Sequence, residues 1–98
     1  MWILSAADSK LPDTFWEFMN LLEAFGSVIR RERKRKLLTQ ERLAELADLH
    51  HNFISLVERG KTSASLDSIA ALAEALDRRP SQLIRGAERD FAEWERKK

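Results

Sequence analysis

A chain of 98 residues is long enough for one domain with a modest core and too short to add a separate catalytic domain. Its 44% hydrophobic and 34% charged residues are typical of a globular protein, and its lack of cysteine excludes disulfides and thiolate metal sites. Nothing in the sequence marks it for secretion, so we expect a cytoplasmic protein.

The charged residues are unevenly distributed around a net charge of +1. Residues 1–25 carry one basic and four acidic side chains, residues 26–61 carry nine basic and five acidic, and residues 62–98 carry seven of each. Positive charge is therefore concentrated in the middle of the chain, as in a protein that meets nucleic-acid phosphates there.

The N-terminal quarter contains one clear helix signal. Residues 1–11 have no sustained periodicity, no basic start typical of a signal peptide and no apolar run long enough for a membrane span. Asp13 is a candidate N-cap, and a helix over 13–24 is predicted from the spacing of Phe15, Phe18, Met19, Leu22 and Phe25. This stripe either packs on the domain's own core or forms a surface for a second subunit or another protein.

A second helix is predicted directly after it, over residues 26–36. Val28 and Ile29 face inward with Phe25, and the rest of the surface is crowded by Arg30, Arg31, Arg33, Lys34, Arg35 and Lys36. Such a run is compatible with a localisation signal or a solvated helix face. It also supplies candidates for contact with phosphate.

Residues 39–60 predict two short helices joined by a tight turn. Thr39 is suited to cap the first helix, and the period of apolar residues resets at residues 48–50, where the turn must lie. Ala44 is small at the point where a crossing helix would come close, and Ile54 and Val57 supply the core of the second helix. These residues at fixed offsets indicate a helix-turn-helix.

Two more helices are predicted in the C-terminal third. Gly60 is expected to end the preceding helix in a left-handed conformation, and Ser65 to cap the next one. That next helix has an apolar stripe of Leu66, Ile69, Leu72, Ala73 and Leu76. Pro80 fits the first position of a last helix that carries Leu83 and Ile84. Residues 87–98 are charged on most faces but present Phe91 and Trp94 three residues apart.

Residues 25–84 resemble the XRE family, the lambda- and Cro-type repressors. The matching residues are Ile29-Arg30, Arg33, Leu38–Glu41, Leu43-Ala44, Phe53–Ser55, Glu58–Lys61, Ser65-Leu66, Ile69, Leu72-Ala73, Ala75-Leu76 and Pro80–Ile84. The resemblance implies an all-α, five-helix lambda-repressor-like DNA-binding domain over residues 25–86. An N-terminal arm with an extra amphipathic helix is expected over 1–24, and a C-terminal helical extension over 87–98.

Three residues stand where the family commonly has glycine: Leu37, Asp48 and Asp77. Aspartate tolerates the left-handed conformation better than most residues. Leu37 does not, so the loop between the first two family helices is expected to have a different shape, with the first helix running longer.

The helix over 50–59 is the expected recognition helix, because the second helix of such a unit enters the major groove. Asn52 is suited to a bidentate pair with adenine, and His51 can donate to guanine, while His50 is expected to cap the helix. Ser55 is expected to face outward with them. The two histidines point in different directions and lack a third ligand, so neither a metal nor another cofactor is expected.

The resemblance implies further contacts. Gln40, Lys61 and Thr62 are expected to contact DNA, and Arg30 and Lys34 are chosen from the basic run for the same role. Arg33 matches a position that pairs with a glutamate of the third family helix, here Glu58, so this pair is expected to be structural.

The sequence predicts a sequence-specific DNA-binding transcriptional regulator rather than an enzyme. It has no glycine-rich phosphate loop, no cysteine nucleophile and only two adjacent histidines. In length it resembles the small controller proteins of restriction–modification systems and simple phage-type repressors. The alternatives are the antitoxin of a toxin–antitoxin pair and a protein-interaction module that has kept the fold and lost DNA binding.

A homodimer on a pseudo-palindromic operator is expected, because one short recognition helix reads only a few base pairs. The expected dimer surface is formed by Leu83, Ile84, Phe91 and Trp94. The N-terminal stripe with Trp16 is the second candidate surface and the expected site for any other protein partner.

Overall fold

The computed structural model describes residues 13–97, with side chains placed for residues 21–96. This range contains five helices and no strand: α1 (Asp13–Arg35), α2 (Gln40–Ala47), α3 (His51–Glu58), α4 (Leu66–Ala75) and α5 (Pro80–Lys97). The predicted all-α, lambda-repressor-like fold is confirmed. The expectations for residues 1–12, and for the side chains of Phe15, Trp16, Phe18 and Met19, fall outside the described part of the chain.

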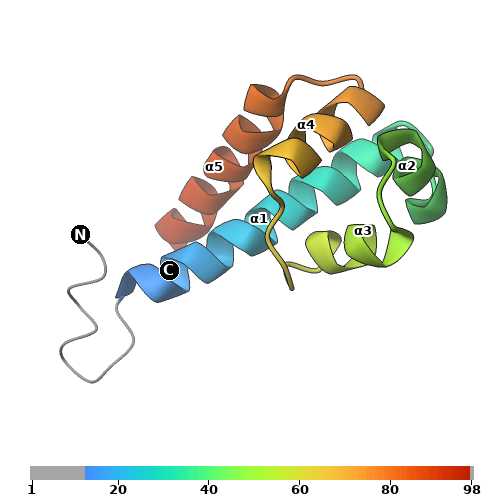
Figure 1. Ribbon diagram of the computed structural model, residues 1–98. Coiled ribbons are helices and arrows are strands. Elements are labelled where there is room, and N and C mark those ends of the chain that lie inside the picture. Colours follow the sequence, from blue (N-terminus) through green and yellow to red (C-terminus); the bar gives the residue numbers. More distant parts are fainter. Residues whose placement is uncertain (1–12, 98) are drawn as a thin grey trace.

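Helix α1 is the element against which the others are arranged. It packs against α5 and α3, while α2 packs against α3 and α4, and α4 also packs against α5. In Figure 1, α1 runs between α5 and α3, so these two helices lie on opposite sides of it. No helix within residues 13–97 is long and apolar enough to cross a membrane.

The N-terminal helix is not a separate element, contrary to the expectation of an extra helix over 13–24. It continues without a break through Gly26 to Arg35. Glycine is present there because α3 comes close: a Cβ at Gly26 would lie 2.8 Å from the carbonyl oxygen of Glu58 and clash with that of Val57. Gly26 therefore serves helix packing and does not end the helix.

The C-terminal extension likewise continues a family helix. Helix α5 runs uninterrupted from Pro80, at its first position as predicted, to Lys97. Phe91, on the part beyond residue 86, is half-buried against the core. The extensions on either side of residues 25–86 therefore lengthen α1 and α5 and add no further helix.

The core lies between the five helices. Its most completely buried large side chains are Ile29, Leu43, Ile54, Val57, Leu72, Leu76 and Leu83. Leu66, predicted to belong to the α4 stripe, is instead 80% exposed. It is the first residue of α4, and Ile69, one turn later, is itself only half-buried, so contact with the core begins after Leu66.

Helices α1 to α4 end in the same way, each with one left-handed residue. These residues are Leu37 (φ 59°), Asp48 (55°), Gly60 (69°) and Asp77 (59°). After α1, the N–H of Leu37 donates to the carbonyl of Lys34 and that of Leu38 to the carbonyl of Arg33, and the other three ends repeat this pair of bonds. This is the Schellman motif, which satisfies carbonyls that a helix end would leave free.

The prediction that Leu37 would change the shape of its loop is therefore wrong. The loop keeps the left-handed turn, and α1 ends at Arg35. The Leu37 side chain is 92% exposed, so it gains almost nothing from burial to offset the cost of its backbone conformation.

Candidate nucleic-acid interface

Helix α3 begins at a well-defined cap. The Nδ1 atom of His50 accepts a hydrogen bond from the N–H of Asn52 at 3.1 Å, as expected for the N-cap residue. The rings of His50 and His51 stack with their centroids 4.9 Å apart, so the expectation that these two side chains point in different directions is wrong. The cap satisfies a first-turn donor and fixes the direction in which the first residues of α3 leave the turn.

The two faces of α3 differ in exposure. Ile54, Val57 and Glu58 are buried, and Phe53 is half-buried against the core. On the other face His51 and Asn52 are exposed, while Ser55 is half-buried. The carbonyl of Ser55 accepts a hydrogen bond from Nε of Arg59 at 3.3 Å. Of the three residues predicted to meet base edges, His51 and Asn52 are thus the most accessible.

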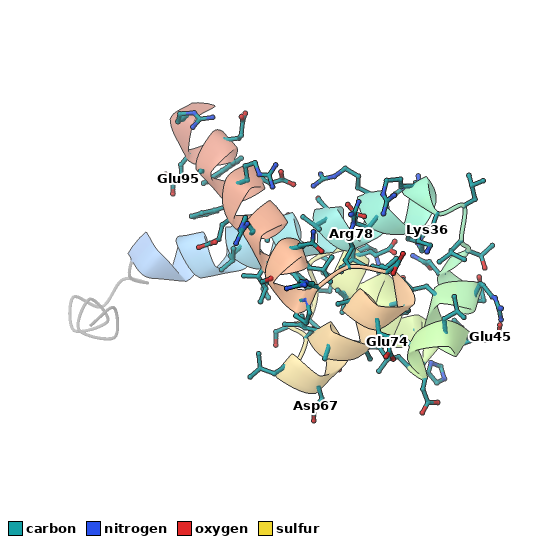
Figure 2. All side chains as sticks on the ribbon, turned by 90° about the horizontal axis from the view of Figure 1, so that it is seen from above. Lys36, Glu45, Asp67, Glu74, Arg78 and Glu95 are labelled. Carbon is teal, nitrogen blue, oxygen red and sulfur yellow. The ribbon has the colours of Figure 1, made fainter. Side chains whose placement is uncertain are left out.

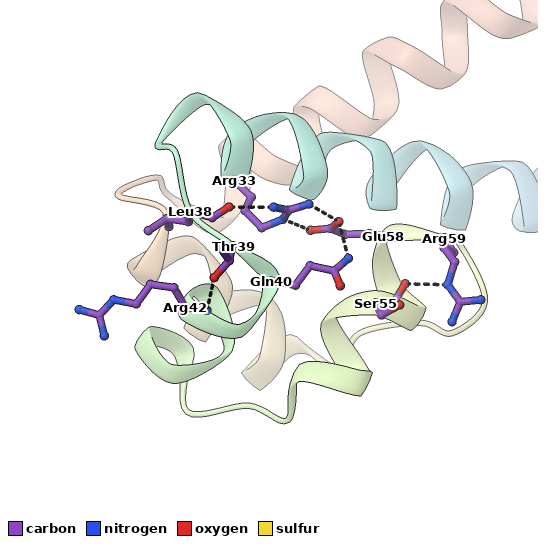
Figure 3. A network of polar contacts seen from close by, with 8 residues as sticks. All are labelled: Arg33, Leu38, Thr39, Gln40, Arg42, Ser55, Glu58 and Arg59. Atoms are coloured by element: carbon purple, nitrogen blue, oxygen red, sulfur yellow. Dashed lines mark hydrogen bonds and ion pairs between the residues drawn. The ribbon is translucent and has the colours of Figure 1, made fainter.

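A buried ion pair holds α3 against α1. Nε of Arg33 donates to Oε2 of Glu58 at 2.7 Å, and one terminal nitrogen donates to Oε1 at 3.0 Å. The other terminal nitrogen donates to the carbonyl of Leu38 at 2.7 Å (Figure 3). Arg33 and Glu58 are 9% and 8% exposed, and hydrogen bonding to the carboxylate raises the pKa of Arg33. The predicted structural pair is therefore present, as a two-pronged contact between planar groups.

Gln40 joins this network. Its side-chain amide donates to Oε1 of Glu58 at 3.0 Å, so the same carboxylate receives Arg33 from α1 and Gln40 from the start of α2 (Figure 3). From the sequence Gln40 is expected to contact DNA, and its bond to Glu58 is not predicted. The contact joins the first three helices at one buried carboxylate, which fixes the position of α3.

The basic side chains near the C-terminal end of α1 differ in their surroundings. Arg35 donates to Glu32 at 2.9 Å and 3.0 Å, and Arg31 lies 3.1 Å from Asp90 of α5. Arg30 and Lys34 are exposed and form no ion pair with any described residue. They lie one helical turn apart, which leaves two free cations on one side of α1.

The loop after α3 supplies the remaining predicted contacts. Gly60, left-handed as expected, packs so closely on α1 that a Cβ there would lie 2.7 Å from Cγ of Glu23. Lys61 is exposed and Thr62 is half-buried, its hydroxyl donating to the carbonyl of Ser63 at 3.4 Å. Close packing of Gly60 on α1 holds the start of this loop beside the C-terminal end of α3.

One residue of the expected dimer surface is unavailable. Leu83 is 1% exposed and belongs to the core, because it lies on the side of α5 that faces the other helices. Ile84 and Trp94 are 40% and 41% exposed. Phe91 is half-buried and its ring stacks with that of Trp94 at 6.1 Å between centroids. Only Ile84, Trp94 and the edge of Phe91 are left for contact with another molecule.

Glu32 is a partly buried carboxylate of α1. Burial opposes its ionisation, but hydrogen bonds from Arg78 and Arg35 outweigh burial and lower its pKa. It links α1 to the turn before α5 through a 2.9 Å contact with Nε of Arg78. This carboxylate therefore remains ionised and helps to hold that turn against α1.

Comparisons with known proteins agree with this arrangement. The sequence profile of the helix-turn-helix family matches residues 29–83. The chain is 39% identical over 66 residues to control protein C.BamHI of Bacillus amyloliquefaciens, spanning 66% of this chain and 82% of that protein. The restriction-modification controller protein C.AhdI from Aeromonas hydrophila superposes with a TM-score of 0.62 at 44% identity, covering 63% of this chain and 94% of C.AhdI. The clp gene regulator ClgR from Corynebacterium glutamicum gives a TM-score of 0.75 at 27% identity, over 79% of this chain and 82% of ClgR.

Proposed function

Because this chain belongs to the XRE-type helix-turn-helix family of DNA-binding transcriptional regulators, we propose that it is a restriction–modification controller protein that binds a pseudo-palindromic operator as a homodimer. The observation that carries the proposal is the construction of α3. Its inner face is fixed by the buried Arg33–Glu58 pair, while His51 and Asn52 stand exposed at its first turn. The names of C.BamHI and C.AhdI favour the controller role over the antitoxin alternative.

Recognition is proposed to begin with the N-terminal end of α3 in the major groove. The Asn52 amide is suited to donate to N7 and accept from N6 of the same adenine in a bidentate pair, and His51 to donate to guanine. Arg30, Lys34 and Lys61 are proposed to meet phosphates on either side. Such contacts set register and affinity but carry no sequence information.

The homodimer is proposed on a geometric ground. Two recognition helices about 34 Å apart reach successive major grooves on one face of the duplex. The apolar side chains that α5 leaves exposed, Ile84 and Trp94, are the proposed contact between copies. These two side chains offer little apolar surface, so the dimer is proposed to be stabilised further by binding to DNA.

The test distinguishes the contacts that read the DNA sequence from those that only bind phosphate. Duplexes selected by the protein from a random library should share two half-sites and bind two chains each. On the best of them Asn52→Ala should cost about 1–3 kcal/mol, and the preference at one base pair per half-site should disappear. Binding to random DNA should change little, as measured by fluorescence anisotropy.

Lys34→Ala is the matched control, because it removes an exposed side chain that no described residue pairs with. It should weaken binding to selected and random DNA about equally and reduce the salt dependence of the affinity. If Asn52→Ala kept the full preference at every base pair, the reading of bases would have to be assigned to another residue, first to His51 or Ser55. An affinity for DNA that did not change with salt concentration would contradict the proposed phosphate contacts.

A further inference from the structure

The side of α1 turned toward α5 carries a second basic site. A groove of about 340 Å³ lies between the two helices. Four arginines line it: Arg31 from α1, Arg78 from the turn before α5, and Arg85 and Arg89 from α5. Two acidic residues, Glu32 and Asp90, line it as well. Figure 2 shows Arg78 beside α1 at one end of this region. The groove is thus lined by two more positive than negative charges.

The two acids are already used by two of the arginines. Arg78 donates to Glu32 at 2.9 Å, and Arg31 lies 3.1 Å from Asp90. Neither Arg85 nor Arg89 forms an ion pair with any residue in the described part of the chain. They are one turn apart on α5, where like charges repel and destabilise a helix. A bound anion would relieve this repulsion.

The groove is separate from both proposed interfaces. It lies on the α5 side of α1, whereas α3 lies on the opposite side (Figure 1). On α5, with 3.6 residues per turn, Gly86 and Arg89 lie on a different flank from Ile84 and Phe91. DNA on α3 and a second copy on Ile84 would therefore leave the flank with Gly86 and Arg89 open, while Asp90 also lies beside Phe91 and Trp94.

The arrangement of the arginines indicates the class of anion. Lining residues of α5 extend from Gln82 to Asp90, about 12 Å along the helix at 1.5 Å per residue. Guanidinium groups bind phosphate oxygens with two parallel hydrogen bonds. None of the described residues that line the groove is aromatic, so they provide no ring on which a base would stack. We propose that the groove between α1 and α5 binds the oligophosphate chain of a small molecule, without selecting the rest of that molecule.

Such a ligand would join α1 to α5 and to the turn before it. Because it binds only the folded chain, it should raise the free energy of unfolding with the logarithm of its concentration once that concentration exceeds the dissociation constant. This inference stands apart from the DNA-binding proposal, because it uses none of the residues of α3.

The experiment is a calorimetric titration of the full chain with inorganic triphosphate, at low salt. Saturable binding of one triphosphate per chain is expected, with adenosine triphosphate binding about equally well. Arg89→Gln should weaken binding about tenfold, the effect of losing one charge-assisted contact. Asp90→Asn should strengthen it, because it removes a negative charge from the lining and releases Arg31.

Arg79→Gln is the matched control, since Arg79 is exposed, adjacent to Arg78 in sequence and outside the groove. It should leave triphosphate binding within about twofold of the original value, which corresponds to a screened surface charge. Equal loss in Arg79→Gln and Arg89→Gln would reduce the effect to net charge and overturn the site. The absence of saturable binding would also overturn the site. Displacement of triphosphate by duplex DNA, in proportion to the DNA bound at α3, would overturn it as well. Circular dichroism of each variant shows whether the helices remain.

Discussion

Helix α1 is held against α3 on one side and against α5 on the other, and the two sides are constructed differently. Toward α3, two glycines allow backbone to approach backbone, and the one ion pair is buried and saturated with hydrogen bonds. Toward α5, the ion pair between Arg31 and Asp90 is exposed, and positive charge is in excess. Helix α3 is thus held by close backbone packing and a buried ion pair, while the opposite side of α1 is more open to solvent.

The difference also shows what decides the role of an arginine. Arg31 and Arg33 are two residues apart in one basic run, yet their side chains are 55% and 11% exposed. A buried charge must be paired, so Arg33 is structural, whereas an exposed charge contributes little to stability and remains available for binding. The position around the helix, and not the residue type, separates the two roles.

The largest expected effect comes from closing the space between α1 and α3. Gly26→Ala places a methyl group against the carbonyl oxygens of Val57 and Glu58, so the two helices must separate. We expect a loss of about 3 kcal/mol or more in the free energy of unfolding, measured by urea denaturation.

Gly86→Ala, on the α5 side, is its control. A Cβ there would meet Val28 methyl carbons at 3.3 Å and 3.5 Å, contacts that flexible side chains can adjust. The better helix propensity of alanine should offset much of the remaining cost, leaving a change of about 1 kcal/mol or less. Equal losses in the two variants would mean that the two sides of α1 are packed alike.

The second effect concerns the buried charge. Glu58→Ala leaves the Arg33 guanidinium without its carboxylate and should cost about 3–5 kcal/mol of unfolding free energy. Replacing both Arg33 and Glu58 by methionine should recover much of that loss, because no charge is then left buried. A double variant as unstable as the sum of its single variants would show no energetic coupling between Arg33 and Glu58 and would contradict this account of the pair.

The smallest effect is expected on the exposed side. Asp90→Ala removes the Arg31 contact, whose side chains are 55% and 34% exposed, and should change the free energy of unfolding by about 0.5 kcal/mol or less. Thermal unfolding at low and high salt measures it, and the difference should shrink as salt rises. A loss comparable to that of Glu58→Ala would contradict the contrast between the two sides.

Much of the fold was predictable because it rests on local chemistry. Thr39, His50 and Ser65 accept the capping hydrogen bonds expected of them, each from a first-turn amide two or three residues ahead. The apolar spacing identified the helices that surround the core. The Arg33–Glu58 pair was predictable only through family resemblance, because its members are far apart in the sequence.

Apart from the loop at Leu37, the errors share one physical origin, which is that the neighbours of a residue are set by tertiary packing. Gly26 looks like a break in sequence but serves as a crossing point for α3. Leu83 and Leu66 are both leucines in apolar stripes, yet one is buried and the other lies before its helix reaches the core. The bond from Gln40 to Glu58 depends on the distance between two helices, which no pattern in either helix contains. The proposed DNA contacts stay predictions.

The left-handed residues at the helix ends have a consequence for how this protein could change. Three of the four positions hold Leu37, Asp48 and Asp77 where glycine would adopt the conformation without strain. The chain is therefore less stable than its fold permits, and Leu37, which is fully in solvent, is the position with the least to lose by replacement. A single substitution at such a position can therefore offset a destabilising change elsewhere in the chain, including one made on the exposed face of α3.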